Sequence, residues 1–216
     1  MKQMYINYGC GLCAPTNWLN FDGSPRLWLE RKPILAQLIQ LRHGRLFPEN
    51  VRYGNIVTGL PIPDGSATAA YASHVLEHLS RCDIERALAN TFRILRPGGT
   101  FRLVVPDLEW RAEVYLRQRQ EYGSSAADSF IESCHIGVRD TPHGLFNRLR
   151  AAYGHTGHHW MYDFGTISSL MLKAGFIDVR RCAIGDSGDR MFDAVEVKER
   201  FYEHGEAELA VQARKP

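Results

Sequence analysis

The sequence predicts an α/β fold, with a mostly parallel sheet of seven strands, or a reduced number, and helices on both faces. Short apolar runs that suit strands alternate with longer segments of helical period. The first runs also end in Gly9, Asp22, Ser73 and His74, residue types that contact ligands. Ligands bind at the carboxyl ends of strands in such sheets, so this arrangement is Rossmann-like.

The individual elements follow from apolar spacing and from turn residues. The strands are expected at residues 4–8, 18–22, 51–57, 67–72, 100–105, 177–184 and 192–197. The helices are expected at 24–41, 82–95, 108–122 and 163–173, with short helices near 126–134 and 145–153. The segment after Tyr202 is polar, which predicts a frayed tail or a short helix at 202–216.

The connection between the first two strands is unusually short. Ten residues separate Gly11 from Asp22. A parallel connection that includes a helix and the next strand needs a dozen residues or more. We therefore expect the first crossover helix to be short or missing.

Length and charge bound the organisation and the partners. The 216 residues suit a single domain, 1–216, in which the Gly-, His- and Arg-rich stretch 123–160 forms a lid-like insert. The net charge of +2 predicts no nucleic-acid or membrane partner. Five scattered cysteines and no room for a signal peptide predict a cytoplasmic location. The oligomeric state is not predicted.

Five stretches together resemble the class I S-adenosylmethionine (SAM)-dependent methyltransferases, most strongly the small-molecule type 11 branch. They are Asn-x-Gly-Cys-Gly at 7–11, Trp-x-Asn-x-Asp at 18–22, Leu-Pro-x-Pro-Asp-Gly-Ser at 60–66, Ala-Ser-His-Val-Leu-Glu-His-Leu at 72–79 and Ile-Leu-Arg-Pro-Gly-Gly-Thr at 94–100. The resemblance implies SAM as cofactor and S-adenosylhomocysteine (SAH) as product. It also implies a cofactor site that contains Gly9, Cys10, Gly11, Asp22, Asn55, Gly59, Leu60, Ser73 and His74.

Methyl transfer to oxygen needs a group that accepts the hydroxyl proton, and histidine suits this task near neutral pH. Five of the nine histidines lie between His135 and His159. The candidate catalytic residues are His74, His158 and His159, and the candidate substrate residues are His155, Arg148, Tyr162 and Asp107.

No metal is predicted. A site formed by His155 with His158 or His159 is the weaker interpretation of that segment. In His74-x-x-Glu77-His78, we expect one histidine to face the crevice and the other to pack, and Glu77 to favour a helix N-terminus.

A small-molecule or carbohydrate acceptor, methylated at oxygen, fits best. Enzymes of this fold that methylate nucleic-acid bases usually carry an Asn/Asp-Pro-Pro-aromatic run after the fourth strand, where Ala72-Ser73-His74-Val75 stands here. Two alternatives stay open: a catalytically degenerate SAM- or adenosine-binding protein, and an NAD-dependent oxidoreductase. The latter would need a third glycine and a full helix after Gly11, where Thr16 and Asn17 occur.

Overall fold

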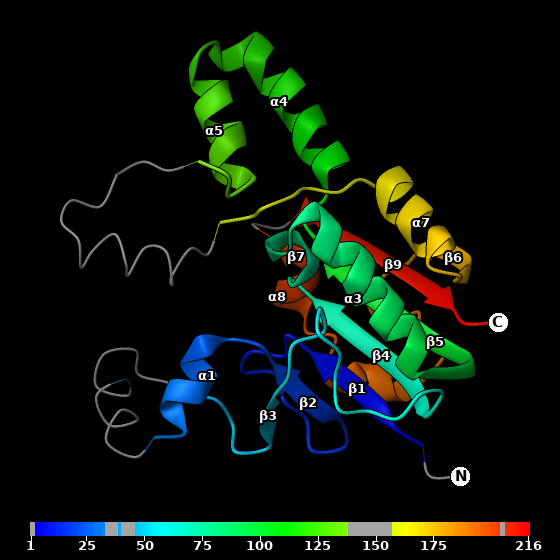
Figure 1. Ribbon diagram of the computed structural model, residues 1–216. Helices are drawn as coiled ribbons and strands as arrows, with labels where there is room; N and C mark the ends of the chain where they lie inside the picture. The colour runs from blue at the N-terminus through cyan, green and yellow to red at the C-terminus, as the bar shows by residue number, and fades with distance from the viewer. Residues whose placement is uncertain (1–2, 33–38, 40–45, 138–156, 204–205) are drawn as a thin grey trace.

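The computed structural model describes residues 3–32, 39, 46–137, 157–203 and 206–216, and its main feature is a seven-stranded sheet (Figure 1). The strand order is β3-β2-β1-β4-β5-β9-β6. The strands of this sheet are β1 (Tyr5–Tyr8), β2 (Leu19–Asp22), β3 (Val51–Tyr53), β4 (Ala67–Ser73), β5 (Leu95–Val105), β6 (Ile177–Arg181) and β9 (Leu209–Arg214). Adjacent pairs among β1 to β5 are parallel, whereas β9 is antiparallel to both β5 and β6. The predicted α/β fold is therefore confirmed.

The helices lie around this sheet. They are α1 (Pro25–Glu30), α3 (Arg81–Ile94), α4 (Leu108–Tyr122), α5 (Ser125–Ser133), α7 (Phe164–Lys173) and α8 (Lys198–Phe201), with the 3-10 helices η1 (Leu76–His78) and η2 (Arg190–Ala194). A two-stranded ribbon pairs β7 (Tyr202–Glu203) with β8 (Glu206–Ala207). Helices α3, α4, α5 and α7 match the predicted segments closely.

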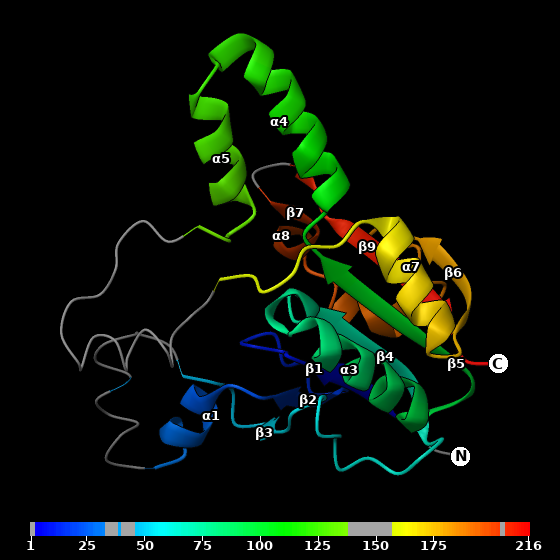
Figure 2. The ribbon, with the colours of Figure 1, turned by 45° about the horizontal axis from the view of Figure 1, so that its top comes forward.

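One face of the sheet is covered by α3 and α7, which lie side by side (Figures 1 and 2). Alternate strand residues such as Ile6, Phe101 and Val211 point to this face and are fully buried. They pack against Leu88 of α3 and Met171 of α7. The apolar residues at alternate strand positions and the apolar faces of the two helices thus pack together in the main core.

The opposite face has no crossover helix between β1 and β2. Residues 9–18 form turns only, so the prediction of a short or missing first helix is confirmed. The segment between β6 and β9 covers this face instead, through η2 and α8. Phe192 from η2 packs edge-to-face on Trp18 and Tyr71, with ring centroids 5.4 and 6.3 Å apart.

A buried arginine attaches the covering segment to the sheet. Arg102 of β5 is 1% exposed and donates to Glu196 Oε1 (2.6 Å), Gln212 Oε1 (2.6 Å) and Asp186 Oδ1 (2.9 Å). Its guanidinium also lies 5.4 Å from the centre of the Phe192 ring. Because these partners come from the β6–β9 segment and from β9, a single side chain connects both to the centre of the sheet.

Helices α4 and α5 form a hairpin that stands away from the sheet (Figure 2). Gly123 ends α4 with a φ of +60°, a conformation that L side chains rarely adopt. Tyr115 and Phe130 pack between the two helices, with ring centroids 5.3 Å apart. The hairpin contains the beginning of the predicted insert 123–160, of which residues 138–156 lie outside the described residues.

Two predictions near the end of the chain are wrong. The segment 202–216 is no polar tail, because its residues Leu209–Arg214 form β9 between β5 and β6. Leu209, Val211 and Ala213 are at most 1% exposed, so this strand is among the most buried. The expected strand at 192–197 is instead the end of η2 and an irregular stretch, since Asp189 caps the 3-10 turn by accepting a hydrogen bond from Met191 N.

The predicted helix at 24–41 is observed as α1, which Ser24 caps; residues 33–38 and 40–41 are not described. The short helix expected near 145–153 also lies outside the described residues. No helix in the described part of the chain is long and apolar enough to cross a membrane.

Candidate active site

A tight turn after β1 opens the candidate cofactor site. Gly9 and Gly11 have φ values of +62° and +54°, which favour glycine. A Cβ at Gly9 would clash with the side chain of Val75, which follows β4. The turn therefore lies directly against the carboxyl end of β4, as strands β1 and β4 are neighbours.

Asp22 stands at the end of β2 and points back to this turn. Its Oδ2 accepts a hydrogen bond from Gly11 N at 2.9 Å, and its Oδ1 accepts one from Ser24 N at 2.8 Å. The residue is 8% exposed. Each carboxylate oxygen has a second lone pair, so Asp22 can still accept hydrogen bonds from a ribose diol.

Arg200 of α8 was not recognised from the sequence and lies beside the same turn. Its Nη1 donates to Ser73 O at 2.8 Å, and its Nη2 is 3.2 Å from the position that a Cβ on Gly11 would take. An arginine beside Gly-x-Gly suits the carboxylate of an amino-acid moiety. The sequence contains no signal for this contact, because Arg200 comes from the segment that replaces the missing helix.

The residues around Ser73 fit a polar ligand. Ser73 is buried, and its Oγ has no hydrogen-bond partner among the described residues. The space between Ser73, Gly9, Cys13 and Arg200 is closed in this structure and too narrow for a water molecule. Glycines that admit a close approach, an unpartnered hydroxyl and a guanidinium together suit a polar ligand that carries a carboxylate.

The predicted adenine-side residues are more scattered. Asn55 follows β3, is exposed, and its Oδ1 accepts a hydrogen bond from Val57 N at 2.9 Å. Gly59 lies against Asn90 and Arg93 in the second half of α3, and Leu60 is buried in the main core. Of the three, Asn55 alone lies next to a strand end at the carboxyl edge.

Cys10 and Cys13 have the properties of packing thiols. Burial, and after it the nearby Asp22 and Cys13, raise the pKa of Cys10 to about 12. Burial also raises the pKa of Cys13. All five cysteines of the protein are free thiols. Thiolates are the reactive form, so these environments argue against a redox role for the pair.

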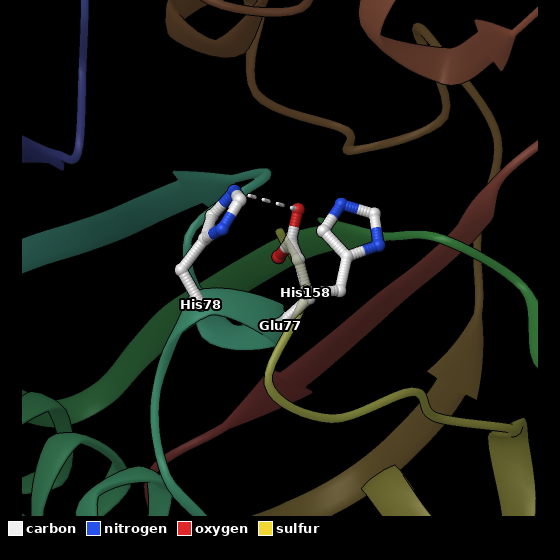
Figure 3. A group of neighbouring side chains, drawn as sticks. All are labelled: Glu77, His78 and His158. Carbon is white, nitrogen blue, oxygen red and sulfur yellow. Dashed lines mark ion pairs between the residues drawn. The ribbon is translucent and has the colours of Figure 1, made fainter. Parts of the chain in front are cut away.

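A cluster of histidines surrounds a buried carboxylate directly after β4 (Figure 3). Glu77 of η1 is 0% exposed, and neither of its oxygens accepts a hydrogen bond from any described residue. His74 Nδ1 lies 3.3 Å and His78 Nε2 lies 3.9 Å from Glu77 Oε1. Figure 3 shows the carboxylate between the rings of His78 and His158.

His158 reaches this cluster from a distant part of the sequence. The backbone N–H groups of His159 and Trp160 donate to Glu77 O at 2.7 and 3.1 Å, which holds the segment 157–160 against η1. Burial lowers the pKa of His158 to about 4, although the Glu77 carboxylate raises it. The ring is therefore neutral at pH 7, and its buried Nδ1 lacks a partner among the described residues.

His74 connects the cluster to the cofactor edge. Its Nε2 lies 2.9 Å from Arg200 O, and its backbone has a φ of +54°, which is unusual for a residue with a side chain. Burial lowers the pKa of His74, but Glu77 and the Arg200 carbonyl outweigh burial and raise it above its ordinary value. His74 thus bridges Arg200 and Glu77.

Comparison with known proteins identifies the domain. Residues 6–103 match the family described as "Methyltransferase domain". The matched range contains the glycine turn, Asp22, Ser73 and Glu77. This match identifies residues 6–103 as part of a methyltransferase domain. The resemblance noted from its motifs, and with it SAM as the cofactor of the family, is confirmed.

Two curated proteins are similar to parts of this methyltransferase domain. A "Probable S-adenosylmethionine-dependent methyltransferase" of Mycolicibacterium smegmatis is 38% identical over 58 residues, which are 27% of this chain and 21% of that protein. An uncharacterized 37.1 kDa protein in a transposon of Streptomyces fradiae is 32% identical over 108 residues. Those residues are 49% of this chain and 30% of that protein, so this chain spans less than a third of either relative.

A solved structure agrees with the fold. The SAM-dependent methyltransferase of Thermotoga maritima, described as a possible histamine N-methyltransferase, has a TM-score of 0.51 and 17% sequence identity. The alignment covers 100% of this chain and 84% of that one. At this identity the similarity shows the fold alone.

The remaining predicted residues of the methyltransferase domain separate into two groups. Tyr162 is buried in the main core. Asp107 caps α4, because its Oδ1 accepts a hydrogen bond from Glu109 N at 3.0 Å. The Oδ2 of Asp107 forms an ion pair with Arg181 at 3.1 Å. Both therefore have contacts within the fold, although the Tyr162 hydroxyl has no partner among the described residues. The His159 side chain is exposed, and His155 and Arg148 lie outside the described residues.

A cavity between α4 and α5 adjoins the histidine cluster. Its volume is about 450 Å³, and its walls include Trp110, Tyr115, Phe130 and His135. The ring of His135 lies 5.1 Å from that of His158, measured between centroids. A concave, aromatic-lined space of this size suits a small organic ligand.

Proposed function

We propose that the methyltransferase domain transfers a methyl group from SAM to an oxygen atom of a small-molecule or carbohydrate acceptor. The histidine–glutamate cluster after β4 carries this proposal. Glu77 and His158 offer three buried acceptor atoms that no described residue occupies. An oxygen nucleophile that carries a proton is the kind of ligand that such atoms receive.

The cofactor end of the site is assigned to the glycine turn and its neighbours. In this proposal Asp22 accepts hydrogen bonds from the ribose hydroxyls, and Arg200 and Ser73 hold the amino-acid moiety. Arg200 contacts the Ser73 carbonyl and the space between Arg200 and the glycine turn is closed, so its side chain would have to shift to admit a ligand. SAM supplies the electrophilic methyl group of a sulfonium when it is bound.

The acceptor end is assigned to the cluster and to the adjoining α4–α5 cavity. The aromatic walls of the cavity provide apolar contact for a sugar or phenol, and its volume of about 450 Å³ matches a small molecule. His135 lines the cavity and packs against His158. Glu77 and His158 do not line the cavity itself, so a hydroxyl of a ligand held there would reach them past His135.

The proposed step is an in-line displacement. A bond forms between the acceptor oxygen and the methyl carbon while the carbon–sulfur bond breaks, and the sulfur keeps the electron pair of that bond as SAH. The hydroxyl proton leaves the acceptor oxygen through the cluster. The residues of the chain align the oxygen, exclude water and receive the proton, which is where the protein contributes to the rate.

The test is calorimetric titration with SAM, SAH and NAD, followed by an assay of SAH release with hydroxyl-bearing sugars and phenols and with matched amines. We expect SAM and SAH to bind, NAD not to bind, and hydroxyl acceptors to release SAH. Binding of SAM with no turnover on any acceptor would favour the degenerate, non-catalytic alternative. Turnover on the amines alone would contradict the assignment to oxygen.

Variants of the cluster test its role. Glu77→Gln and His158→Gln should leave SAM affinity within twofold and lower turnover by about 100-fold or more, the typical contribution of proton transfer. His159→Gln is the matched control, because this neighbour's side chain is exposed. Equal losses in all three variants would contradict the assignment.

A small-molecule acceptor, rather than nucleic acid or membrane, and a cytoplasmic location belong to the same proposal. The free thiols at all five cysteines support the location, since such thiols persist in reducing compartments.

A further inference from the structure

We propose that Glu77, His78 and His158 bind a divalent transition-metal ion. One ligand atom from each residue lies within 4.8 Å of the other two (Figure 3). Bonds from zinc to nitrogen or oxygen are about 2.0–2.2 Å, so two ligands of one ion lie within about 4.4 Å of each other. Small rotations of the side chains therefore bring the three atoms to bonding distance.

Each of the two histidine rings presents a nitrogen toward the carboxylate (Figure 3). His78 Nδ1 lies 3.4 Å from Gly157 O, and a carbonyl can only accept, so Nδ1 donates and Nε2 is the nitrogen that faces Glu77. Figure 3 shows one ring nitrogen of His158 turned toward the Glu77 carboxylate. A backbone carbonyl on the far nitrogen is the usual way in which a metal-binding histidine is oriented.

The carboxylate supplies the second argument. Glu77 is 0% exposed, and both of its oxygens lack a hydrogen-bond partner among the described residues. His74, at 3.3 Å, is the nearest ion-pair partner of this carboxylate among the described residues, and proteins pair a buried charge or use it to coordinate a metal. A cation among Glu77, His78 and His158 would balance the negative charge of Glu77.

The donor set indicates the class of metal. Two imidazole nitrogens and one carboxylate suit zinc and the ions near it in the first transition row, rather than calcium or magnesium, which prefer oxygen. Three protein ligands leave a coordination position open. The use of that position rests on the proposed function: a hydroxyl of the acceptor bound there would ionise more easily and would lose its proton to water before methylation, since Glu77 and His158 would then hold the ion.

His74 provides the competing explanation. Its Nδ1 lies 3.3 Å from Glu77 Oε1, so a protonated His74 would balance the carboxylate without a metal. The two explanations differ in whether His78 and His158 matter for ion binding, and this difference can be measured.

The experiment titrates protein that has been freed of metal by a chelator with Co²⁺, whose visible absorption reports its ligands, and then displaces Co²⁺ with Zn²⁺. We expect one equivalent to bind, with d–d bands of a four- or five-coordinate ion and without a thiolate charge-transfer band. Glu77→Gln, His78→Gln and His158→Gln should each weaken binding at least 10-fold, the lower limit seen even for residues that only support a ligand. His159→Gln and Cys13→Ser should not change it.

The proposal is overturned if no stoichiometric binding occurs, if the three variants bind as the unaltered protein does, or if a thiolate band shows that cysteines hold the ion. Circular dichroism and the melting temperature show whether each variant folds. One folded variant among the three is enough to test the proposal. Metal binding without SAH release would leave the site in place and contradict the proposed function. SAH release that is unaffected by chelation would instead contradict the catalytic use of the metal.

Discussion

At the scale of single residues, Asp22 has two tasks that a substitution must separate. Its carboxylate organises the glycine turn through Gly11 N and stabilises the residue after β2 through Ser24 N. Replacement by alanine would remove both contacts together with any contact to the cofactor. An asparagine keeps the shape and one acceptor oxygen, and so reports the charge more directly.

We expect Asp22→Asn to weaken SAM binding by about 1–3 kcal/mol, because a charged acceptor for the ribose hydroxyls is replaced by a neutral one. Calorimetric titration with SAM measures the change. Asp64→Asn is the control, since that side chain is 74% exposed. Unchanged SAM affinity in a folded Asp22→Asn protein would place the ribose elsewhere.

Asp186 makes stability depend on acid pH. Burial raises the pKa of its carboxyl, but hydrogen bonds from Arg180 and Arg102 outweigh burial and lower the pKa to about 2 from an ordinary value of 3.8. A group with a lowered pKa stabilises the fold above its unfolded pKa. That contribution is lost as the pH falls from near 4 toward 2.

The measurement is urea unfolding of the protein and of Asp186→Asn from pH 7 down to pH 3. We expect the unaltered protein to be the more stable at pH 7 and the difference to shrink as the pH falls below 4. A difference that is constant over this range would show that the carboxylate charge does not matter.

At the scale of elements, β9 is the strand on which the sheet depends most. It pairs with β5 over six residues and with β6 on its other side. Without it, β6 has no neighbour in the sheet, and the apolar residues of β5 lose one flank of the core. If residues 202–216 were a frayed tail, substitutions in them would not change the free energy of unfolding. If Leu209–Arg214 form β9, substitutions of its buried residues should lower that free energy.

Leu209→Ala should lower the free energy of unfolding by about 2–5 kcal/mol, as expected for a leucine that is 1% exposed in a core. Leu116→Ala in α4 is the matched control, because Leu116 is 55% exposed and should change stability by about 0.5 kcal/mol or less. Denaturant unfolding gives both values. Similar, small effects of the two substitutions would contradict the placement of β9.

The sequence predicts most elements because their patterns are long and local. Helix α4, for example, is marked by Asp107 at its start and Gly123 at its end. The strand β9 was missed because Leu209–Ala213 is a short apolar run within a charged segment, and its burial depends on the distant β5 and β6. The prediction of a strand at 192–197 was wrong for a similar reason. Phe192 is buried because it packs on Trp18 from a 3-10 helix, and not because it belongs to a strand.

The candidate site was predictable only in part. The glycine turn, Asp22 and Ser73 follow strands, and their positions come from the general geometry of parallel sheets. Two features of the site depend on tertiary contacts between segments that are more than 75 residues apart. One is the contact of His158 with Glu77, and the other is the hydrogen bond from Arg200 to Ser73, whose residues are separated by 127 positions. No local pattern marks Glu77 as the centre of the cluster.

At the scale of the whole molecule, Arg102 holds together parts that are distant in sequence. Its partners Asp186, Glu196 and Gln212 lie on the β6–β9 segment and on β9. Arg102 and Glu196 both have side chains that are at most 1% exposed. Loss of the arginine would therefore leave a buried carboxylate without its counter-ion.

Arg102→Met should lower the free energy of unfolding by about 3–5 kcal/mol, the usual cost of breaking a buried ion pair from one side. Arg86→Met removes an arginine whose side chain is 68% exposed, from a surface pair with Asp83, and should cost about 1 kcal/mol or less. Urea unfolding compares them. Adding Glu196→Met to Arg102→Met should restore part of the loss, and no recovery would contradict the pairing.

The cover that η2 and α8 form over β1 and β4 also determines the order in which the molecule can be completed. In a chain made from its N-terminus, the strands β1 to β5 emerge before the residues that shield one of their faces and before the strand that fills the gap between β5 and β6. During synthesis, the sheet face that η2 and α8 later cover therefore stays exposed until those residues are made. An exposed apolar face favours aggregation. We expect folding of this chain to depend more on chaperones that bind nascent chains than folding of a relative whose first crossover helix covers the same face early.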